Sequence, residues 1–119
     1  MATVLITDDA SLIRAQLREI ITDLGHEVIG EAQDGQEAID KNKKLDPDVI
    51  MMDITMPNLS GTEAVKEIRK EDTDVKIIMC SAMGQQRLVV DAIEAGAQDF
   101  VVKPFTPERI EQAFLYVLT

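Results

Sequence analysis

The stretch VLITDDASLI, residues 4–13, contains both the element that sets the fold and the residues that raise the question of function. Its first half is a short apolar run, which is typical of a buried strand. The run stops at two adjacent carboxylates, Asp8 and Asp9. Neighbouring like charges repel each other, and the packing of a strand end gives no reason for them. The pair therefore indicates a cation or a reaction at this end of the strand.

The same pattern of a short strand followed by a helix recurs along the chain. We expect strands at residues 3–7, 27–32, 48–53, 75–81 and 100–103. Helical periodicity and capping signals predict helices at residues 11–24, 36–45, 61–70 and 85–95, and from 107 onward. Strands that alternate with helices predict an α/β fold, in which helices cover both faces of a parallel sheet. The third and fourth strands read as continuous apolar runs and suit the centre, whereas the polar second strand suits an edge.

Length and composition exclude several classes of protein. A chain of 119 residues suits one domain with one core. No apolar run approaches the roughly 18 residues of a membrane span, and the first residues lack the features of a secretion signal. The single cysteine, Cys80, cannot form an internal disulfide, which fits a cytoplasmic location. The net charge of −10 argues against binding to nucleic acid or to an anionic membrane.

Polar side chains stand where four of the predicted strands end. The first strand is followed by Asp8 and Asp9, and the others end in Asp53, Ser81 and Lys103. Since ligands of parallel α/β folds bind beyond the carboxyl ends of the strands, we expect these side chains to meet. Each residue alone has an ordinary structural explanation, such as a helix cap, a turn acid or a surface lysine. Their joint occurrence on different strands favours a single site.

The residue types at this edge predict phosphoryl-transfer chemistry. Three clustered carboxylates raise one another's pKa unless a cation neutralises them. Mg²⁺, or Mn²⁺, suits such a cluster because it takes oxygen ligands and often shares its coordination shell with a phosphate. An ammonium and a hydroxyl would hold the other phosphate oxygens. One carboxylate would itself be the nucleophile and form an aspartyl phosphate.

Four segments together resemble the signature stretches of bacterial two-component response-regulator receiver domains. They are ITDDA, MMDITMPNLSG, IIMCSAM and FVVKPF, and the resemblance extends from end to end of the chain. It is strongest to the CheY type, the single-domain chemotaxis regulators. The resemblance implies a doubly wound, flavodoxin-like sheet of five parallel strands in the order 2-1-3-4-5, with five helices. It also implies that residues 1–119 form one receiver domain without an effector domain.

The resemblance assigns the nucleophile and the metal ligands. Asp53 would accept the phosphoryl group. Asp9 and Asp53 would bind Mg²⁺ directly, and Asp8 would act largely through water. The backbone carbonyl of Thr55 would complete the protein ligands. Such a protein catalyses only its own phosphotransfer and dephosphorylation, and we therefore do not expect an enzyme in the usual sense.

A second set of residues would respond to the phosphoryl group. Ser81 would supply a switch hydroxyl, and Lys103 would contact the phosphoryl oxygens. The resemblance also implies a cis peptide bond between Lys103 and Pro104, the residue type at which cis bonds occur. Phe100 occupies the aromatic switch position, where many members of the family have Tyr. The hydrogen bond that such a Tyr hydroxyl makes is therefore missing here.

The implied partners are a kinase and an output target. A sensor histidine kinase would donate the phosphoryl group, and the flagellar motor switch would bind the face built by the fourth helix, the fifth strand and the fifth helix. Val89, Phe100 and Tyr116 are the residues predicted on this face. Apolar residues 88–90 span about 200° at about 100° per helical residue, which is wider than a core stripe needs, so at least one should be exposed. We also expect a phosphatase as a partner, and a monomer.

Three other functions fit parts of the sequence. A phosphorelay intermediate would pass the phosphoryl group from Asp53 to a histidine of another protein. A phosphohydrolase with an aspartate nucleophile, in the haloacid-dehalogenase style, would need a second acid two residues later, where this chain has Thr55. A flavodoxin-like electron carrier would need a phosphate-binding loop after the first strand and aromatic residues around the flavin, but only 3% of the residues are aromatic.

The chain's single histidine also has two interpretations. His26 followed by Glu27 resembles the pair found at a phosphohistidine donor. The apolar residues that follow indicate a strand and not a helix. We therefore expect His26 to be an exposed residue at the start of a strand.

Overall fold

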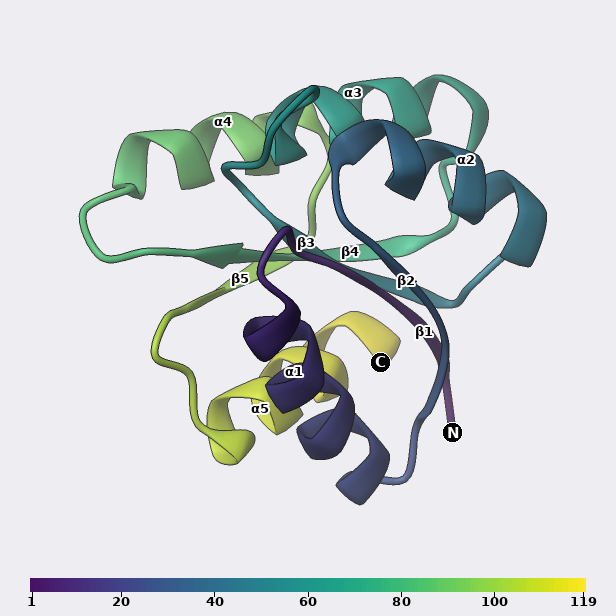
Figure 1. Cartoon of the computed structure of the whole chain (residues 1–119), viewed down its shortest axis with the longest axis vertical. Coiled ribbons are helices and arrows are strands. Elements are labelled where there is room, and N and C mark those ends of the chain that lie inside the picture. Colours follow the sequence, from purple (N-terminus) through teal and green to yellow (C-terminus); the bar gives the residue numbers. More distant parts are fainter.

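The computed structural model describes residues 1–119 and has three layers, with helices on both faces of a central sheet (Figure 1). The strands are β1 (Thr3–Thr7), β2 (Glu27–Ala32), β3 (Val49–Asp53), β4 (Lys76–Ser81) and β5 (Asp99–Val102). The helices are α1 (Ser11–Asp23), α2 (Gly35–Leu45), α3 (Gly61–Glu71), α4 (Gln86–Ala95) and α5 (Pro107–Leu118). The predicted α/β alternation is confirmed, and no predicted end differs from the observed one by more than a residue.

The order of the strands marks one position at the carboxyl edge of the sheet. The order is β2-β1-β3-β4-β5, and every neighbouring pair is parallel, as the resemblance implied. Helices α1 and α5 cover one face, and α2, α3 and α4 cover the other (Figure 1). The order reverses between β1 and β3, so the chain leaves these two neighbours toward opposite faces. This point of reversal, beyond the carboxyl ends of β1 and β3, is where doubly wound folds bind ligands.

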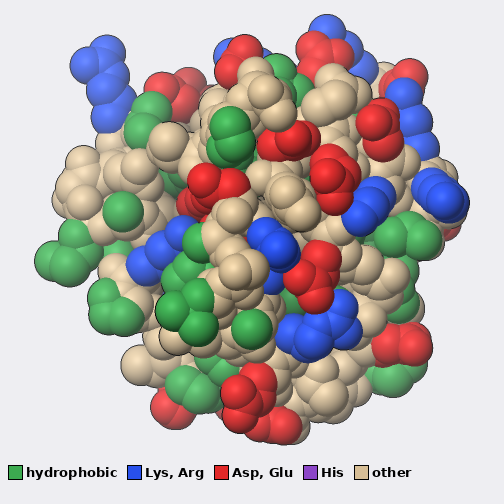
Figure 2. All heavy atoms as spheres, viewed as in Figure 1, with side chains coloured by type: hydrophobic (Ala, Val, Ile, Leu, Met, Phe, Trp, Pro, Cys, Tyr) green, Lys and Arg blue, Asp and Glu red, His purple; other side chains and the backbone are tan.

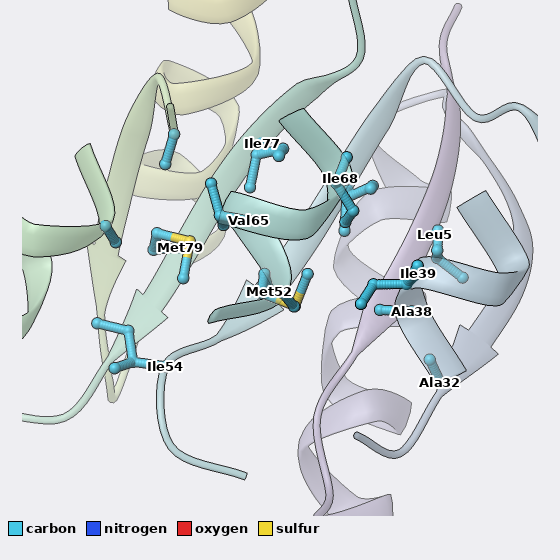
Figure 3. Packing of buried hydrophobic residues seen from close by; sticks show 14 of the residues in the cluster. Leu5, Ala32, Ala38, Ile39, Met52, Ile54, Val65, Ile68, Ile77 and Met79 are labelled. Atoms are coloured by element: carbon cyan, nitrogen blue, oxygen red, sulfur yellow. The ribbon is translucent and has the colours of Figure 1, made fainter. Parts of the chain in front are cut away.

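The central strands are buried on both faces, which explains their continuous apolar sequences. One core of 17 buried residues lies between the sheet and α2, α3 and α4; Figure 3 shows part of it, including Leu5, Met52 and Val65. A second core of 14 buried residues lies between the sheet and helices α1 and α5. Alternate residues of β1 divide between the two, since Val4 and Ile6 belong to the second. Strand β2, at the edge, is mostly half-exposed, as its polar sequence predicted.

The loop after β3 returns to the sheet by a close contact at Gly61, the first residue of α3. The Gly61 N–H donates to the carbonyl oxygen of Ile54 at 2.7 Å. A Cβ atom at Gly61 would lie only 2.0 Å from the carbonyl oxygen of Asp53. Helix α3 can therefore begin against the end of β3 only because residue 61 has no side chain. Ser60 caps the helix in a capping box with Glu63.

The sequence prediction for His26 is wrong, because its ring is half-buried. Its Nδ1 accepts the backbone N–H of Ala2 at 3.0 Å. The ring also stacks on Phe114 of α5, with 4.8 Å between the ring centroids. His26 therefore fixes the beginning of β1 to the helix below it.

Two further features concern the length of the helices and the distribution of surface charge. No helix of the structure has both the length and the apolar character needed to cross a bilayer. On the face in Figure 2, acidic and basic side chains are intermixed.

Candidate functional site

Three aspartates meet at the carboxyl edge of the sheet. Asp8, Asp9 and Asp53 each place a carboxylate oxygen within 4.8 Å of the others. Thr7 pairs with Met52 in the ladder between β1 and β3, so Asp8 and Asp53 come next on adjacent strands. Asp8 and Asp53 are only 1% and 7% exposed, whereas Asp9 is open to solvent. The sequence-predicted cluster of carboxylates is therefore assembled, with one member accessible.

Lys103 reaches this cluster from the loop after β5. Its Nζ donates to Asp8 Oδ2 at 2.9 Å and to Asp53 Oδ1 at 3.2 Å. Burial opposes the charge of Lys103, but the hydrogen bond to Asp8 and the charges of both carboxylates outweigh it and raise the pKa of Lys103. The backbone N–H of Lys103 donates to the carbonyl oxygen of Ser81 at 2.7 Å, and the peptide bond to Pro104 is cis. These contacts place the ammonium between the two buried acids.

Asp53 is the electrostatically strained member of the cluster. Burial and the nearby charge of Asp8 raise the pKa of Asp53 to about 6, although Lys103 acts against the rise. One ammonium thus compensates two buried carboxylates only in part. Carboxylates in this condition are stabilised by a divalent cation, and shifted pKa values of this kind concentrate at functional sites.

Ser81, the last residue of β4, and Thr55, in the loop after β3, border the acids. Asp53 pairs with Cys80 in the ladder between β3 and β4, so Ser81 stands one residue further toward the edge. The Ser81 side chain is 1% exposed, whereas Thr55 is exposed in the loop after β3. Ser81 does not cap α4, whose N-cap is Gln85. Its position at the end of a central strand therefore favours the predicted role beside the acids.

Gln85 is a residue of this region that the sequence analysis missed. Its Oε1 accepts the backbone N–H of Ala82 at 2.7 Å, and its Nε2 donates to Thr55 Oγ1 at 3.1 Å. An uncharged glutamine at the start of a predicted helix carries no periodicity or charge signal, so the sequence pattern gave no indication of these contacts. The structure shows that this side chain joins the β4–α4 loop to the β3–α3 loop.

An apolar pocket connects the edge of the sheet with α4 and β5. Its volume is about 340 Å³, and its lining extends from Ser81 through the following loop to Phe100. Phe100 is 36% exposed, on the surface beside this space. The pocket therefore extends from the end of β4 to the predicted partner face.

The structure corrects one residue of that predicted partner face. Val89 is 7% exposed and belongs to the core, while its neighbours Leu88 and Val90 are 40% and 53% exposed. Only one of three consecutive helical residues can point at the sheet, which confirms that the run is wider than the core stripe. Phe100 and Tyr116 are exposed as predicted. Val90 therefore replaces Val89 as the α4 residue of this surface.

Comparison with known proteins gives one consistent family. The sequence profile of the response regulator receiver domain matches residues 4–115. The chain is 57% identical over 110 residues to the chemotaxis protein CheY of Thermotoga maritima and 50% identical over 110 residues to that of Bacillus subtilis, in both cases over 92% of each chain. Among solved structures, it matches the CheX-CheY-BeF3-Mg+2 complex from Borrelia burgdorferi with a TM-score of 0.93 and 36% identity. That match covers 98% of this chain and 89% of the other.

Proposed function

The chain belongs to the response regulator receiver family and is CheY-like, and from this premise we propose that it is a phosphorylation-activated switch in a chemotaxis two-component system. Proteins of this type are signalling proteins and not conventional enzymes. The switch would take a phosphoryl group from a sensor histidine kinase onto Asp53 and then bind an output target, the flagellar motor switch, more tightly. The observation that carries the proposal is the cluster of three aspartates, two of which, Asp8 and Asp53, accept hydrogen bonds from Lys103.

The acidic cluster supports a divalent metal site. Receiver domains bind Mg²⁺ at an acidic pocket, and three oxygens within 4.8 Å of one another suit this hard cation or Mn²⁺. Asp9, Asp53 and the carbonyl of Thr55 would hold the ion directly, and Asp8 would hold it through water. Bound there, the ion would neutralise the negative charge that accumulates as a phosphoryl group approaches. The raised pKa of Asp53 supports this assignment, because the buried acids lack sufficient positive charge.

Asp53 would act as the nucleophile. One of its carboxylate oxygens attacks the phosphorus of the kinase's phosphohistidine, the new O–P bond forms as the N–P bond breaks, and the histidine leaves. Lys103, already 3.2 Å from Asp53 Oδ1, donates to an oxygen of the incoming group while it keeps its bond to Asp8. The 7% exposure of Asp53 limits the access of competing water.

The signal would pass from the phosphoryl group to the face formed by α4, β5 and α5. A phosphoryl group needs donors for its oxygens, so the Ser81 hydroxyl and the loop behind it would move toward Asp53. Phe100 would then turn into the pocket of about 340 Å³ beside it. This motion changes the surface around Val90 and Tyr116, where the target would bind. The target's preference for the new surface is what turns phosphorylation into a signal.

Phosphorylation by a small-molecule donor tests the proposal. With acetyl phosphate and Mg²⁺, mass spectrometry should find one hydroxylamine-sensitive phosphoryl group on the wild-type protein. Asp53→Asn should accept none, and chelation of Mg²⁺ should prevent labelling of the wild type. Asp40→Asn, which changes an exposed aspartate of α2, is the matched control and should be labelled normally. A phosphoryl group on another residue of Asp53→Asn would remove Asp53 from this role, and labelling of the wild type that persists with chelator would remove the proposed metal requirement.

A further inference from the structure

Gln85 lies between the two loops that border the proposed phosphorylation site. Its Oε1 accepts the Ala82 N–H at 2.7 Å, and its Nε2 donates to Thr55 Oγ1 at 3.1 Å. The first bond fixes the shape of the β4–α4 loop, because it closes a turn from residue 82 to residue 85. The second bond fixes that loop against the β3–α3 loop. One side chain thus controls both the shape and the position of the loop.

The Ala82 N–H is the first backbone donor beyond the end of β4. Asp53 pairs with Cys80 across the two strands, and Ser81 closes β4, so Ala82 leaves the sheet at the edge where a phosphoryl group on Asp53 would lie. A phosphoryl group presents three acceptor oxygens. Lys103 can supply only part of the donors they need, and a backbone N–H to an anionic oxygen makes a strong hydrogen bond. In the structure this N–H is already bonded to Gln85.

From these contacts we infer that Gln85 is a latch that stabilises the resting conformation. Its amide occupies the Ala82 N–H and holds the β4–α4 loop to Thr55, and a phosphoryl group must displace it before the loop can move toward Asp53. The inference rests on the proposed function and adds a residue that regulates it. Gln85 positions the loop and takes no part in phosphoryl transfer.

The surroundings of Gln85 leave the loop free to move once the latch opens. Gly84 has φ +89°, and a Cβ atom at that position would meet nothing within 4 Å. No side chain caps the start of α4, where Gln85 is the N-cap residue. Gly84 therefore leaves the loop room to change shape, while the carbonyl oxygen of Gln85 accepts the Val89 N–H at 3.0 Å and holds the end of the loop on α4. Within the loop, Gln85 holds the Ala82 N–H, and its bond to Thr55 Oγ1 is the side-chain connection from this loop to the β3–α3 loop.

Beryllofluoride, the phosphoryl mimic, measures the strength of the latch. Gln85→Met keeps the length of the side chain and removes both hydrogen bonds, and Gln85→Ala removes the side chain. Both variants should bind beryllofluoride with saturating Mg²⁺ about three- to tenfold more tightly than the wild type, which is the effect of one or two modest hydrogen bonds. Gln86→Ala is the matched control, because Gln86 is the next residue and is exposed. The beryllofluoride affinity of this variant should equal that of the wild type.

Hydrogen exchange gives a second readout that does not depend on the ligand. Without beryllofluoride, the Ala82 amide of Gln85→Met should exchange faster than that of the wild type, while amides of the central strands should not change. If the wild type binds beryllofluoride and both Gln85 variants are folded, an affinity of the variants that is equal to or weaker than that of the wild type would overturn the latch. A wild type that fails to bind beryllofluoride with Mg²⁺ would instead overturn the proposed function, and the latch with it.

Discussion

The two ends of the sheet both carry aspartates, but they use them in opposite ways. At the amino end, Asp48 Oδ2 accepts the N–H of Thr3 at 2.9 Å. Asp72 Oδ1 accepts the N–H groups of Asp74 and Val75 at 3.0 and 3.1 Å. These carboxylates are satisfied by the backbone beside them, so they hold the turns that lead into the strands. They need no ligand from outside.

At the carboxyl end, the acids face one another. Asp8 Oδ1 accepts the N–H of Ala10 at 2.9 Å, but Asp53 has Lys103 as its donor and no backbone N–H. Asp8 and Asp53 share a single ammonium, that of Lys103. Burial raises the pKa of Asp53 to about 6; burial acts in the same direction on Asp72, but hydrogen bonds from Asn42 and the backbone outweigh it and lower the pKa of Asp72. An acid satisfied by its neighbours shapes a loop, whereas an acid without enough donors requires a ligand.

The size of a cavity does not distinguish the two ends. The hollow at the amino end, lined by Asp48 and Asp72, measures about 730 Å³. The pocket beside Ser81 at the other end measures about 340 Å³. The smaller pocket is the one next to the proposed phosphorylation site, because Ser81, at the end of β4, is part of its lining. Charge balance is therefore the better guide to function in this fold.

The largest expected effect is the difference between removing an acid at the carboxyl end and removing one at the amino end. Asp9→Ala should weaken Mg²⁺ binding and slow labelling by acetyl phosphate by more than about 100-fold, since even changes around a metal ligand cost about 10–100-fold. Asp74→Asn, at the amino end, should leave both unchanged. Metal titration and mass spectrometry measure the two quantities. Normal labelling of Asp9→Ala would break the comparison, because the two ends would then be equally dispensable.

The next effect concerns how a phosphoryl group at the carboxyl end changes the affinity for the target. Ser81→Ala keeps the acids and should still be phosphorylated, but it lacks the hydroxyl that responds to the phosphoryl group. Beryllofluoride should increase target binding of the wild type by about 5- to 150-fold, the usual range of allosteric coupling, and should increase that of Ser81→Ala little. Affinities measured with and without beryllofluoride give the coupling. An equal gain in both proteins would show that the signal leaves the site by another route.

Stability should respond with opposite signs at the two ends. The pKa of Asp53 is raised from 3.8 to about 6, so its ionisation disfavours the folded state, with no penalty below pH 3.8 and the full penalty above about pH 6. In the absence of metal at pH 7.5, Asp53→Asn should therefore increase the free energy of unfolding by about 1–3 kcal/mol. Asp72→Asn should decrease it by about 1 kcal/mol, because charged hydrogen bonds to the backbone are lost.

Urea unfolding of the two variants beside the wild type measures this difference. At pH 4, where Asp53 is largely protonated in the folded protein, the advantage of Asp53→Asn should disappear. Stabilisation by both substitutions, or by neither, would mean that the two ends are electrostatically alike.

The smallest effect is a pH dependence at the amino end. Burial and the charge of the N-terminus lower the pKa of His26 from 6.5. The bond from the Ala2 N–H needs neutral Nδ1, so its contribution is present above pH 6.5 and is lost as the pH falls through the lower pKa of the folded state. Between pH 7.5 and 5, the wild type should lose about 0.5–1.5 kcal/mol more stability than His26→Gln. Equal losses would exclude His26 as the titrating group.

The sequence predicted the fold because the relevant signals are local. Alternation of strands and helices is visible in the chain, and the carboxyl ends of parallel strands meet by topology. That rule alone brought Asp8, Asp53 and Lys103 to one edge. The ion pairs between them could not be foreseen, because they depend on the path of the chain after β5. The contrast with the amino-end acids was also invisible, since it depends on which backbone N–H groups face each carboxylate.

Two other failures have physical causes of the same kind. Val89 and Val90 are chemically identical, and only the rotation of α4 on the sheet decides which one is buried. Gln85 and Gln86 are likewise identical in sequence terms, and only the first reaches Thr55. Sequence patterns report how much apolar or polar surface a segment carries. They do not report the rotation of a helix or the partner of an amide.

The close contact at Gly61 has a consequence for how this protein can change over generations. A Cβ atom there would lie 2.0 Å from the carbonyl oxygen of Asp53, whereas one at Gly84 would meet nothing within 4 Å. Any substitution at residue 61 must shift the backbone of Asp53, the proposed nucleophile, so the start of α3 admits almost no variation. The loop after β4 has room around it, and its neighbour Gln85 acts only on position. Mutations in the β4–α4 loop can therefore change how strongly the protein responds to phosphorylation during evolution, while the start of α3 beside Asp53 stays the same.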